Sequence, residues 1–277
     1  MTENLSERVF KTPGGDIHYW VSSQRRDAPN IVFLPGLTAD HRLFDKQIRH
    51  FEGSANCLVW DPPSHGASRP FELTWTMDDL ANWLSAVIEA EAFAQPVLVG
   101  QSMGGYVAQA FMKRNPGVAS GFVSIDSAPL DRSYYSKWEL AFLKHTHAMY
   151  SSIPWPLLVK WGSDGCSTSE YGRALMREMM EGYSKPEYVD LAAHGYRVLA
   201  TAVEESQGLG FERPIFLLCG TKDMAGSSKR YNRAWAERMS LPLVWIEGAG
   251  HNSNTDSPDA VNLILDDAIR DIGQGVA

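Results

Sequence analysis

Six short runs of apolar residues recur along the chain, and each is followed closely by a glycine, a proline or an acidic residue. They lie at 30–34, 57–60, 97–99, 122–125, 215–219 and 243–246. Runs of this length without polar alternation are typical of strands buried on both faces of a sheet. Most of them are separated by segments with helical periodicity, at 78–90, 103–114, 227–239 and 257–272. The alternation predicts an α/β fold, a mostly parallel sheet with helices on both faces.

Two stretches depart from this alternation. Near the beginning, residues 8–11 and 16–22 flank Pro13, Gly14 and Gly15, which predicts an antiparallel hairpin at the edge of the sheet. Later, helical patches at 138–150 and 170–183 occur in a long interval without a convincing buried strand. We therefore expect a core that is interrupted once: a first core part at 1–126, a helical cap at 127–210 and a second core part at 211–277.

Composition restricts the possible partners. The chain has 44% hydrophobic residues and a net charge of −8, and no run of basic residues is longer than two. These features argue against nucleic acid or a membrane surface as a partner. No apolar stretch approaches the roughly 20 residues that span a bilayer, and residues 1–11 are too polar for a signal peptide. With three widely separated cysteines and no CxxC pair, the chain is expected to be cytoplasmic.

The sharpest chemical signal is Gly-x-Ser-x-Gly at 100–104, which occurs once in the chain. It lies between the apolar run at 97–99 and the predicted helix at 103–114. Such a strand-to-helix turn is strained and projects the serine hydroxyl, while the glycines let the strand and the helix approach closely. The pattern predicts Ser102 as a nucleophile.

A serine hydroxyl is a weak nucleophile that needs a base, and the base needs an orienting acid. His251 follows the last apolar run, where its imidazole could reach the carboxyl end of the sheet. Asp223 follows the preceding run and gives the chain order serine, acid, histidine. We take Asp223 as the first choice for the acid, and Asp126, directly after the run at 122–125, as the alternative.

Acyl transfer also requires two N–H groups for the oxyanion. Met103 supplies one candidate, because it follows the nucleophile at the beginning of a helix. The other should come from the turn after the first apolar run. Pro35 has no N–H and Gly36 permits an unusual backbone, so Leu37 is the candidate donor there.

From about residue 16 to residue 272 the chain resembles the α/β-hydrolase fold superfamily. The residues that carry the resemblance are Gly100-Gln101-Ser102-Met103-Gly104-Gly105, the Asp223 and His251 turns, Pro35-Gly36-Leu37 and Asp61-Pro62-Pro63-Ser64-His65-Gly66-Ala67-Ser68. The last is similar to the family's Asp-x-Pro-Gly-His-Gly-x-Ser, with Ser64 replacing a glycine. Because that stretch is usually structural, His65 is left out of the catalytic set. A second departure is Pro35, where many members have histidine.

The resemblance implies an eight-stranded, mostly parallel sheet, a cap after the sixth strand and a Ser-His-Asp triad. A serine at the elbow, rather than an aspartate, argues against the epoxide hydrolase and haloalkane dehalogenase branches. We therefore expect a serine hydrolase that cleaves a small carboxylic ester through an acyl-enzyme on Ser102, without a cofactor. The same triad would serve a thioesterase, a carbon–carbon bond hydrolase or a cofactor-free lyase. A ligand-binding protein of this fold that lacks catalysis is a further alternative.

The substrate-binding residues have weaker signals. Gln101 adjoins the nucleophile, and Trp138, Trp155 and Trp161 of the cap are candidates to line an apolar channel, although packing explains them equally well. His145 and His147 are two candidate ligands for a metal ion. Residues two apart on a helix point to different faces, however, and no acidic or cysteine ligand adjoins them, so we predict no metal site.

Overall fold

The computed structural model describes residues 5–22, 25–206, 210 and 213–275. Its eight strands form one sheet in the order β1-β2-β4-β3-β5-β6-β7-β8. β1 (Leu5–Thr12) and β2 (Gly15–Ser22) form an antiparallel hairpin at the edge, as predicted. β2 then pairs antiparallel with β4 (Asn56–Trp60), which begins the parallel part of the sheet.

The parallel strands coincide with the six apolar runs. They are β3 (Asn30–Leu34), β4, β5 (Val97–Gln101), β6 (Gly121–Ile125), β7 (Ile215–Gly220) and β8 (Leu243–Ile246). In β3, Ile31 and Phe33 belong to one hydrophobic cluster, whereas Val32 and Leu34 belong to the other. Both faces of the strand are therefore buried, which explains why the sequence does not alternate with polar residues. The predicted fold class is confirmed.

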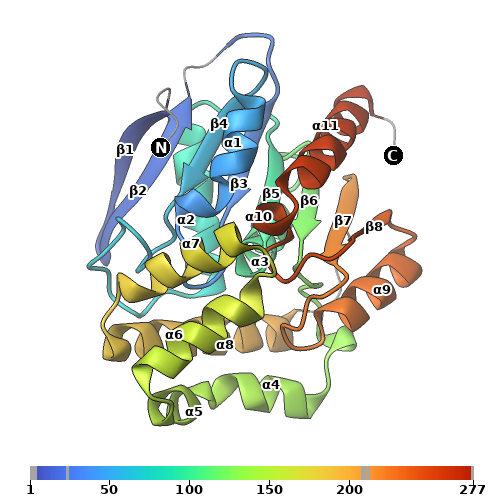
Figure 1. Ribbon diagram of the computed structural model, residues 1–277. Helices are drawn as coiled ribbons and strands as arrows, with labels where there is room; N and C mark the ends of the chain where they lie inside the picture. Colours follow the sequence, from blue (N-terminus) through green and yellow to red (C-terminus); the bar gives the residue numbers. More distant parts are fainter. Residues whose placement is uncertain (1–4, 23–24, 207–209, 211–212, 276–277) are drawn as a thin grey trace.

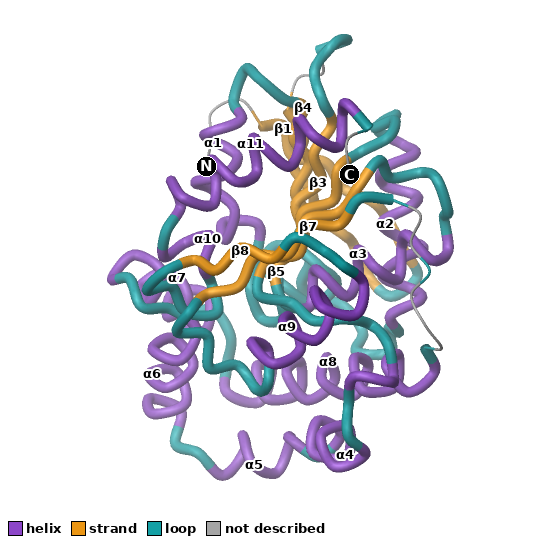
Figure 2. The backbone as a smooth tube through the Cα atoms, turned by 90° about the vertical axis from the view of Figure 1, so that its right-hand side faces the viewer, coloured by secondary structure: helices purple, strands orange, loops and turns teal. Residues whose placement is uncertain are grey.

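Helices cover both faces of the sheet. Figure 2 shows α1 (Asp45–Phe51) and α11 (Pro258–Gln274) on one side, with α2 (Met77–Ala90) and α3 (Met103–Arg114) on the other. α9 (Ser228–Met239) buries Trp235 in the same hydrophobic cluster as α2 and α3. The short α1 and α10 (Ser253–Asp256) were not expected, because helices of seven and four residues are too short to show a periodic pattern.

The described residues between β6 and β7 form helices joined by loops and contain no strand. Its helices are the 3₁₀-helix η2 (Arg132–Tyr134), α4 (Lys137–Lys144), α5 (Thr146–Ser152), α6 (Trp155–Cys166), α7 (Glu170–Glu181) and α8 (Lys185–Glu205). In Figure 1, α4, α5, α6 and α8 lie beneath the carboxyl end of the sheet.

The limits of this cap at 127–210 stay a prediction, and its second boundary adjoins residues 207–209 and 211–212, outside the described part. Local signals fix where two cap helices begin, because Ser136 and Ser184 form capping boxes with Glu139 and Glu187. The predicted helix at 138–150 is divided at His145 into α4 and α5. None of the described helices is long and apolar enough to cross a membrane.

Candidate active site

Ser102 joins β5 to α3 in a strained turn, with φ 49° and ψ −117°. A Cβ atom added to Gly100 would lie 2.6 Å from the carbonyl carbon of Gly104, and one added to Gly104 would lie 1.8 Å from the Leu34 carbonyl oxygen. Both positions therefore exclude any side chain. This is the physical reason for the Gly-x-Ser-x-Gly spacing, and it leaves the serine hydroxyl projecting from the end of the sheet.

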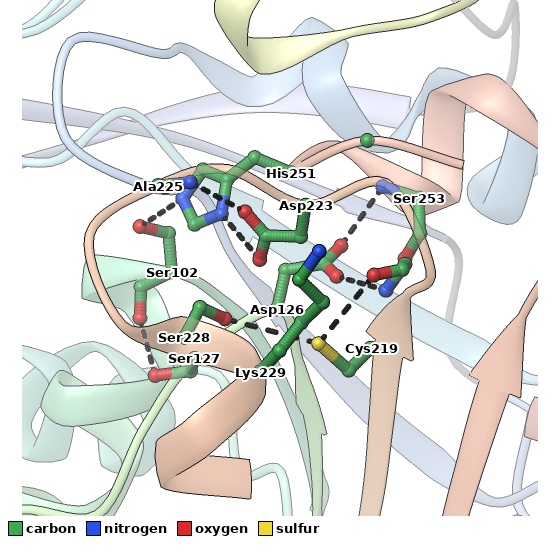
Figure 3. Close-up of polar contacts among 12 residues, drawn as sticks. Ser102, Asp126, Ser127, Cys219, Asp223, Ala225, Ser228, Lys229, His251 and Ser253 are labelled. Atoms are coloured by element: carbon green, nitrogen blue, oxygen red, sulfur yellow. Dashed lines mark hydrogen bonds and ion pairs between the residues drawn. The ribbon is translucent and has the colours of Figure 1, made fainter. Parts of the chain in front are cut away.

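The structure brings Ser102, His251 and Asp223 together (Figure 3). His251 Nε2 lies 2.8 Å from Ser102 Oγ, and His251 Nδ1 lies 3.0 Å from Asp223 Oδ2. Ser102 directly follows β5, Asp223 lies in the loop after β7 and His251 lies in the loop after β8. Because these strands are parallel, the three residues meet at the carboxyl end of the sheet. A hydrogen-bonded hydroxyl, imidazole and carboxylate can activate the hydroxyl oxygen as a nucleophile.

The electrostatics of this group suit proton transfer. Burial alone would lower the pKa of His251, but the charge and hydrogen bond of Asp223, together with the charge of Asp126, raise it above its ordinary value. Burial works in the opposite sense on Asp223, and the charge and hydrogen bond of His251 outweigh it, so the pKa of Asp223 is lowered. The carboxylate therefore stays ionised and favours the protonated form of His251.

Asp126, the alternative acid, contacts backbone amides instead. Its Oδ1 accepts a hydrogen bond from Gly220 N at 2.7 Å, and its Oδ2 accepts one from Ser253 N at 2.9 Å. It thus ties the end of β7 to the segment that follows His251. Burial and the charge of Asp223 raise the pKa of Asp126. Of the two candidate acids, Asp223 is the one with a hydrogen bond to the imidazole in this structure.

The two predicted oxyanion donors lie beside the nucleophile. Leu37 and Met103 line the same cavity as Ser102, and neither N–H has an acceptor among the described residues. A Cβ atom on Gly36 would lie 2.3 Å from Gln101 Oε1 and 3.1 Å from Ser102 Cβ. The glycine therefore lets the loop backbone pass directly against the nucleophile, where free N–H groups could bind an anion.

Two cavities meet at Ser102. The first lobe has a volume of about 320 Å³ and is lined in part by α6 and α8. Its lining residues include Leu37, Leu158, Trp161 and Tyr188. The second lobe, about 420 Å³, lies between α4, α5 and α9 and includes Tyr135, Glu139, Phe142 and Tyr231. Both are lined by the same junction residues, Ser102, Tyr106, Tyr150, Tyr196, Leu199, Ala225 and His251. No lysine or arginine lines either lobe in the part of the chain that the structure describes.

The predicted substrate-binding residues have different positions. Trp161 lines the first lobe. Gln101 lines it too, and its amide donates to His251 O at 2.8 Å and to Asn252 Oδ1 at 3.0 Å, so it also holds the histidine loop. Trp155 packs on Tyr188, with ring centroids 5.5 Å apart, and lines neither lobe.

The prediction for Trp138 is wrong in this structure. Its side chain is 85% exposed and lines neither lobe. The reason is helical geometry, because α4 buries Leu140, and residues two apart on a helix point to different faces.

Sequence reasoning missed the residues of α8 that line the first lobe. Tyr188, Ala192, Gly195, Tyr196 and Leu199 recur at helical spacing, which places them on one face. This periodicity was a usable signal. α8 lines the cavity at Ser102. In the sequence, a helix face that lines a cavity has the same apolar spacing as a face that packs into a core.

Other chemically interesting groups have structural partners. His65 is buried, its Nδ1 lies 2.9 Å from Pro63 O, and burial lowers its pKa to about 4. His145 Nδ1 lies 2.8 Å from the Ala141 carbonyl oxygen and His147 Nε2 lies 3.0 Å from Asp190, so the two histidines face different groups.

Two clusters of described residues hold three potential metal ligands within 4.8 Å: Asp40, His41 and Asp61, and Asp126, Cys219 and Asp223. Their carboxylates are already engaged. Asp61 Oδ1 accepts from His41 N, and Asp126 accepts two backbone amides. Burial also raises the pKa of the Cys219 thiol, which disfavours the thiolate that a metal binds.

Comparison with known proteins gives one family and a widely shared fold. Residues 31–262 match the family model described as Alpha/beta hydrolase family. The chain is 26% identical over 245 residues to 2-succinyl-6-hydroxy-2,4-cyclohexadiene-1-carboxylate synthase of Salmonella paratyphi B, which covers 84% of this chain and 91% of that protein. It is 22% identical to the uncharacterized hydrolase YugF of Bacillus subtilis, covering 95% of this chain and 97% of that protein.

Solved structures agree on the fold. A thermophilic esterase from Thermogutta terrifontis matches with a TM-score of 0.74 and 18% identity, covering 97% of this chain and 98% of that one. The Cif epoxide hydrolase from Acinetobacter nosocomialis matches with a TM-score of 0.77 and 15% identity, covering 97% of this chain and 90% of that one. Because these identities are low and the two enzymes differ in chemistry, the activity has to be argued from the site.

Proposed function

The chain belongs to the alpha/beta hydrolase family, and from that premise we propose that it is a serine hydrolase that cleaves a small, uncharged carboxylic ester. The observation that carries the proposal is the continuous hydrogen-bonded series from Ser102 Oγ through His251 to Asp223. A neighbouring pair of N–H groups without protein acceptors adds the second requirement of acyl transfer.

The reaction begins when Ser102 Oγ attacks the ester carbonyl while His251 Nε2 takes its proton. The carbonyl electron pair moves to the oxygen, which the N–H groups of Leu37 and Met103 bind as an oxyanion. Collapse of this intermediate breaks the ester bond, and the imidazolium protonates the departing alcohol. Water then attacks the acyl-enzyme by the same route and releases the acid, while Asp223 keeps His251 oriented throughout.

The charge of the site supports an uncharged substrate. The described residues that line the two lobes include no ammonium or guanidinium group, and the carboxylate of Glu139 lines the second lobe. A substrate carboxylate would therefore lose water without gaining an opposite charge. This argues against the activity of the Salmonella relative, whose name describes a carboxylate product.

The size of the site supports a small substrate. Cavities of about 320 and 420 Å³ on the two sides of Ser102 have the size of ordinary small-molecule sites, so each can hold one side of a small ester. Apolar atoms supply most of the lining surface of both lobes, so apolar contact would provide most of the binding free energy.

A fluorophosphonate tests the proposal directly. We expect intact-mass spectrometry to detect one adduct on the wild-type protein and none on Ser102→Ala. Across p-nitrophenyl esters from acetate to decanoate, turnover should be highest for short chains and fall by about 10³-fold or more in Ser102→Ala. Ser152→Ala, an exposed serine of α5, is the control that keeps both labelling and turnover. Equal labelling of Ser102→Ala, or no labelling of the wild type, would reject the proposal.

A further inference from the structure

Two tyrosines of the cap lie at the junction of the two lobes. Tyr150 comes from α5 and Tyr196 from α8, and both line each lobe together with Ser102 and His251. Their rings are stacked at 24° with centroids 6.2 Å apart, and their hydroxyl oxygens are 3.5 Å apart. The two phenols therefore present their polar ends together at the place where a substrate would cross the nucleophile.

The hydrogen bonds of this pair are incomplete. A single long contact joins the two hydroxyls, and neither has another partner among the described residues. Two hydroxyls carry two protons, and one contact uses only one of them. Whichever oxygen donates, one O–H remains without a protein acceptor. Burial raises the pKa of both phenols, so both keep their protons at neutral pH.

A second tyrosine pair in the same site shows the contrast. The hydroxyls of Tyr106 and Tyr135 are 2.8 Å apart, and Tyr135 also donates to the Pro129 carbonyl oxygen at 3.0 Å. Both protons of that pair have protein acceptors. The Tyr106 and Tyr135 pair therefore has no unused donor, whereas the Tyr150 and Tyr196 pair has one.

We propose that the Tyr150 and Tyr196 hydroxyls form a subsite for a second oxygen atom of the substrate, so that the preferred substrate is an ester bearing an uncharged keto or ether oxygen near the scissile carbonyl. A cavity donor without a protein acceptor can bind a substrate oxygen, and a plain alkyl chain offers it no such partner. The absence of lysine and arginine from the described lining makes a neutral oxygen the better match than a carboxylate. The subsite rests on the proposed function for the chemistry of the ester bond.

Matched esters test the subsite. p-Nitrophenyl 4-oxopentanoate, 5-oxohexanoate and 6-oxoheptanoate are each compared with the plain ester of the same chain length, after division by the hydroxide-catalysed rate. We expect the wild type to favour at least one oxo ester by about tenfold in kcat/KM. The ratio should fall to about one in Tyr150→Phe/Tyr196→Phe, because the phenyl rings keep the packing and lack the donors.

Tyr106→Phe is the matched control, because it removes a hydroxyl at the same junction whose proton already has an acceptor on Tyr135. The oxo preference should persist in this variant. An equal loss in Tyr106→Phe, or a wild type without any oxo preference, would overturn the subsite and leave the serine mechanism intact.

Binding to Ser102→Ala separates the subsite from catalysis. Tryptophan fluorescence, to which Trp161 of the first lobe contributes, reports the Kd of each ester without turnover. We expect the favoured oxo ester to bind about tenfold more tightly than its plain counterpart, and the difference to vanish when both tyrosines are phenylalanine. If the wild type cleaves no ester while this difference persists, the hydrolase proposal fails and the subsite stands. Equal Kd values reject the subsite.

Discussion

At the scale of single residues, the position of Ser102 depends on the absence of side chains at the neighbouring glycines. Ser102 can hold a positive φ because Gly100 lets α3 approach β5 closely, and Gly104 lets α3 approach the end of β3. Such backbone strain costs about 1–3 kcal/mol and persists only where the surroundings hold it. Main-chain packing therefore positions Ser102 independently of His251 and Asp223.

Gly104→Ala should be severely destabilising, by more than about 3 kcal/mol, because its Cβ would overlap the Leu34 carbonyl oxygen. Thermal unfolding measures the loss. The control is Gly165→Ala in α6, where an added Cβ meets nothing within 4 Å, and alanine should leave the melting temperature unchanged or slightly raised. A folded Gly104→Ala protein with normal fluorophosphonate labelling would contradict this account of the elbow.

At the scale of elements, α4 of the cap is attached to α9 of the core through one carboxylate. Glu139 accepts hydrogen bonds from Tyr231 Oη at 2.6 Å and Ser227 Oγ at 3.1 Å, and it pairs with Arg230. It also closes the capping box of its own helix with Ser136. Burial would raise its pKa, but the hydrogen bonds from Tyr231 and Ser136 outweigh burial and lower it to about 2.

Glu139→Gln should reduce the free energy of unfolding at neutral pH by about 1–2 kcal/mol, because charge-assisted hydrogen bonds are replaced by weaker ones. The sign with pH follows from the lowered pKa. The stabilisation is complete above the ordinary pKa of 4.5 and is lost as the pH falls toward about 2, so the variant and the wild type should converge in acid. Urea unfolding at several pH values measures this.

Asp190→Asn is the control for Glu139→Gln, since its ion pair with His147 is more than half exposed on both sides. Exposed pairs contribute about 0–1 kcal/mol, so this variant should change stability little at any of these pH values. An equal loss in both variants would show that Glu139 is not a special attachment point of the cap.

At the scale of the whole molecule, the site is assembled from the segments that follow five strands of the sheet, β3, β5, β6, β7 and β8. Asp126 follows β6, and its two oxygens hold the end of β7 and the segment after β8. The charge of Asp126 also raises the pKa of His251, after the larger effects of burial and Asp223. We therefore expect Asp126 to act as a positioning residue, through its negative charge and through its hydrogen bonds to the two segments.

The pH profile should report this arrangement. The proposed base is active when His251 is neutral, so kcat/KM should rise with pH through a pKa above the ordinary 6.5. Asp126→Asn removes a negative charge that favours the imidazolium, so the rise should move to lower pH by about half a unit. Initial rates on a short p-nitrophenyl ester from pH 5 to 9 measure the shift.

The control for the pH profile is Asp78→Asn, which removes an exposed acid that pairs with Arg114 outside both lobes. Its profile should coincide with that of the wild type. A shift of the Asp126→Asn profile to higher pH, or no shift in a variant with a normal melting temperature, would show that Asp126 does not act on His251.

Much of this molecule could be predicted from local patterns. Unbroken apolar runs predicted the buried strands. Glycines two positions before and two positions after a serine predicted the strained turn at Ser102. The resemblance to the α/β-hydrolase fold superfamily is confirmed by the family match over residues 31–262 and by the eight-stranded sheet. The limits of the cap and the catalytic roles of the site residues stay predictions.

The sequence left outcomes open, or missed them, where a local pattern was shared by different outcomes or was too short to read. Trp138 and Trp161 are both aromatic residues of cap helices, yet only Trp161 lines the site. Asp126 and Asp223 both follow buried strands, yet only Asp223 meets the imidazole in this structure. α1 and α10 were missed because their seven and four residues are too few to show a period.

The sequence by itself determined the strands, the main core helices and the strained turn at Ser102, because hydrophobic period and glycine spacing act between residues close together in the chain. Only the tertiary structure decided which carboxylate meets His251, which cap residues line the lobes, and that the Tyr150 and Tyr196 hydroxyls share a single contact. These outcomes depend on distances between segments far apart in the chain. A shift of α8 by one helical turn would replace the α8 residues that line the first lobe.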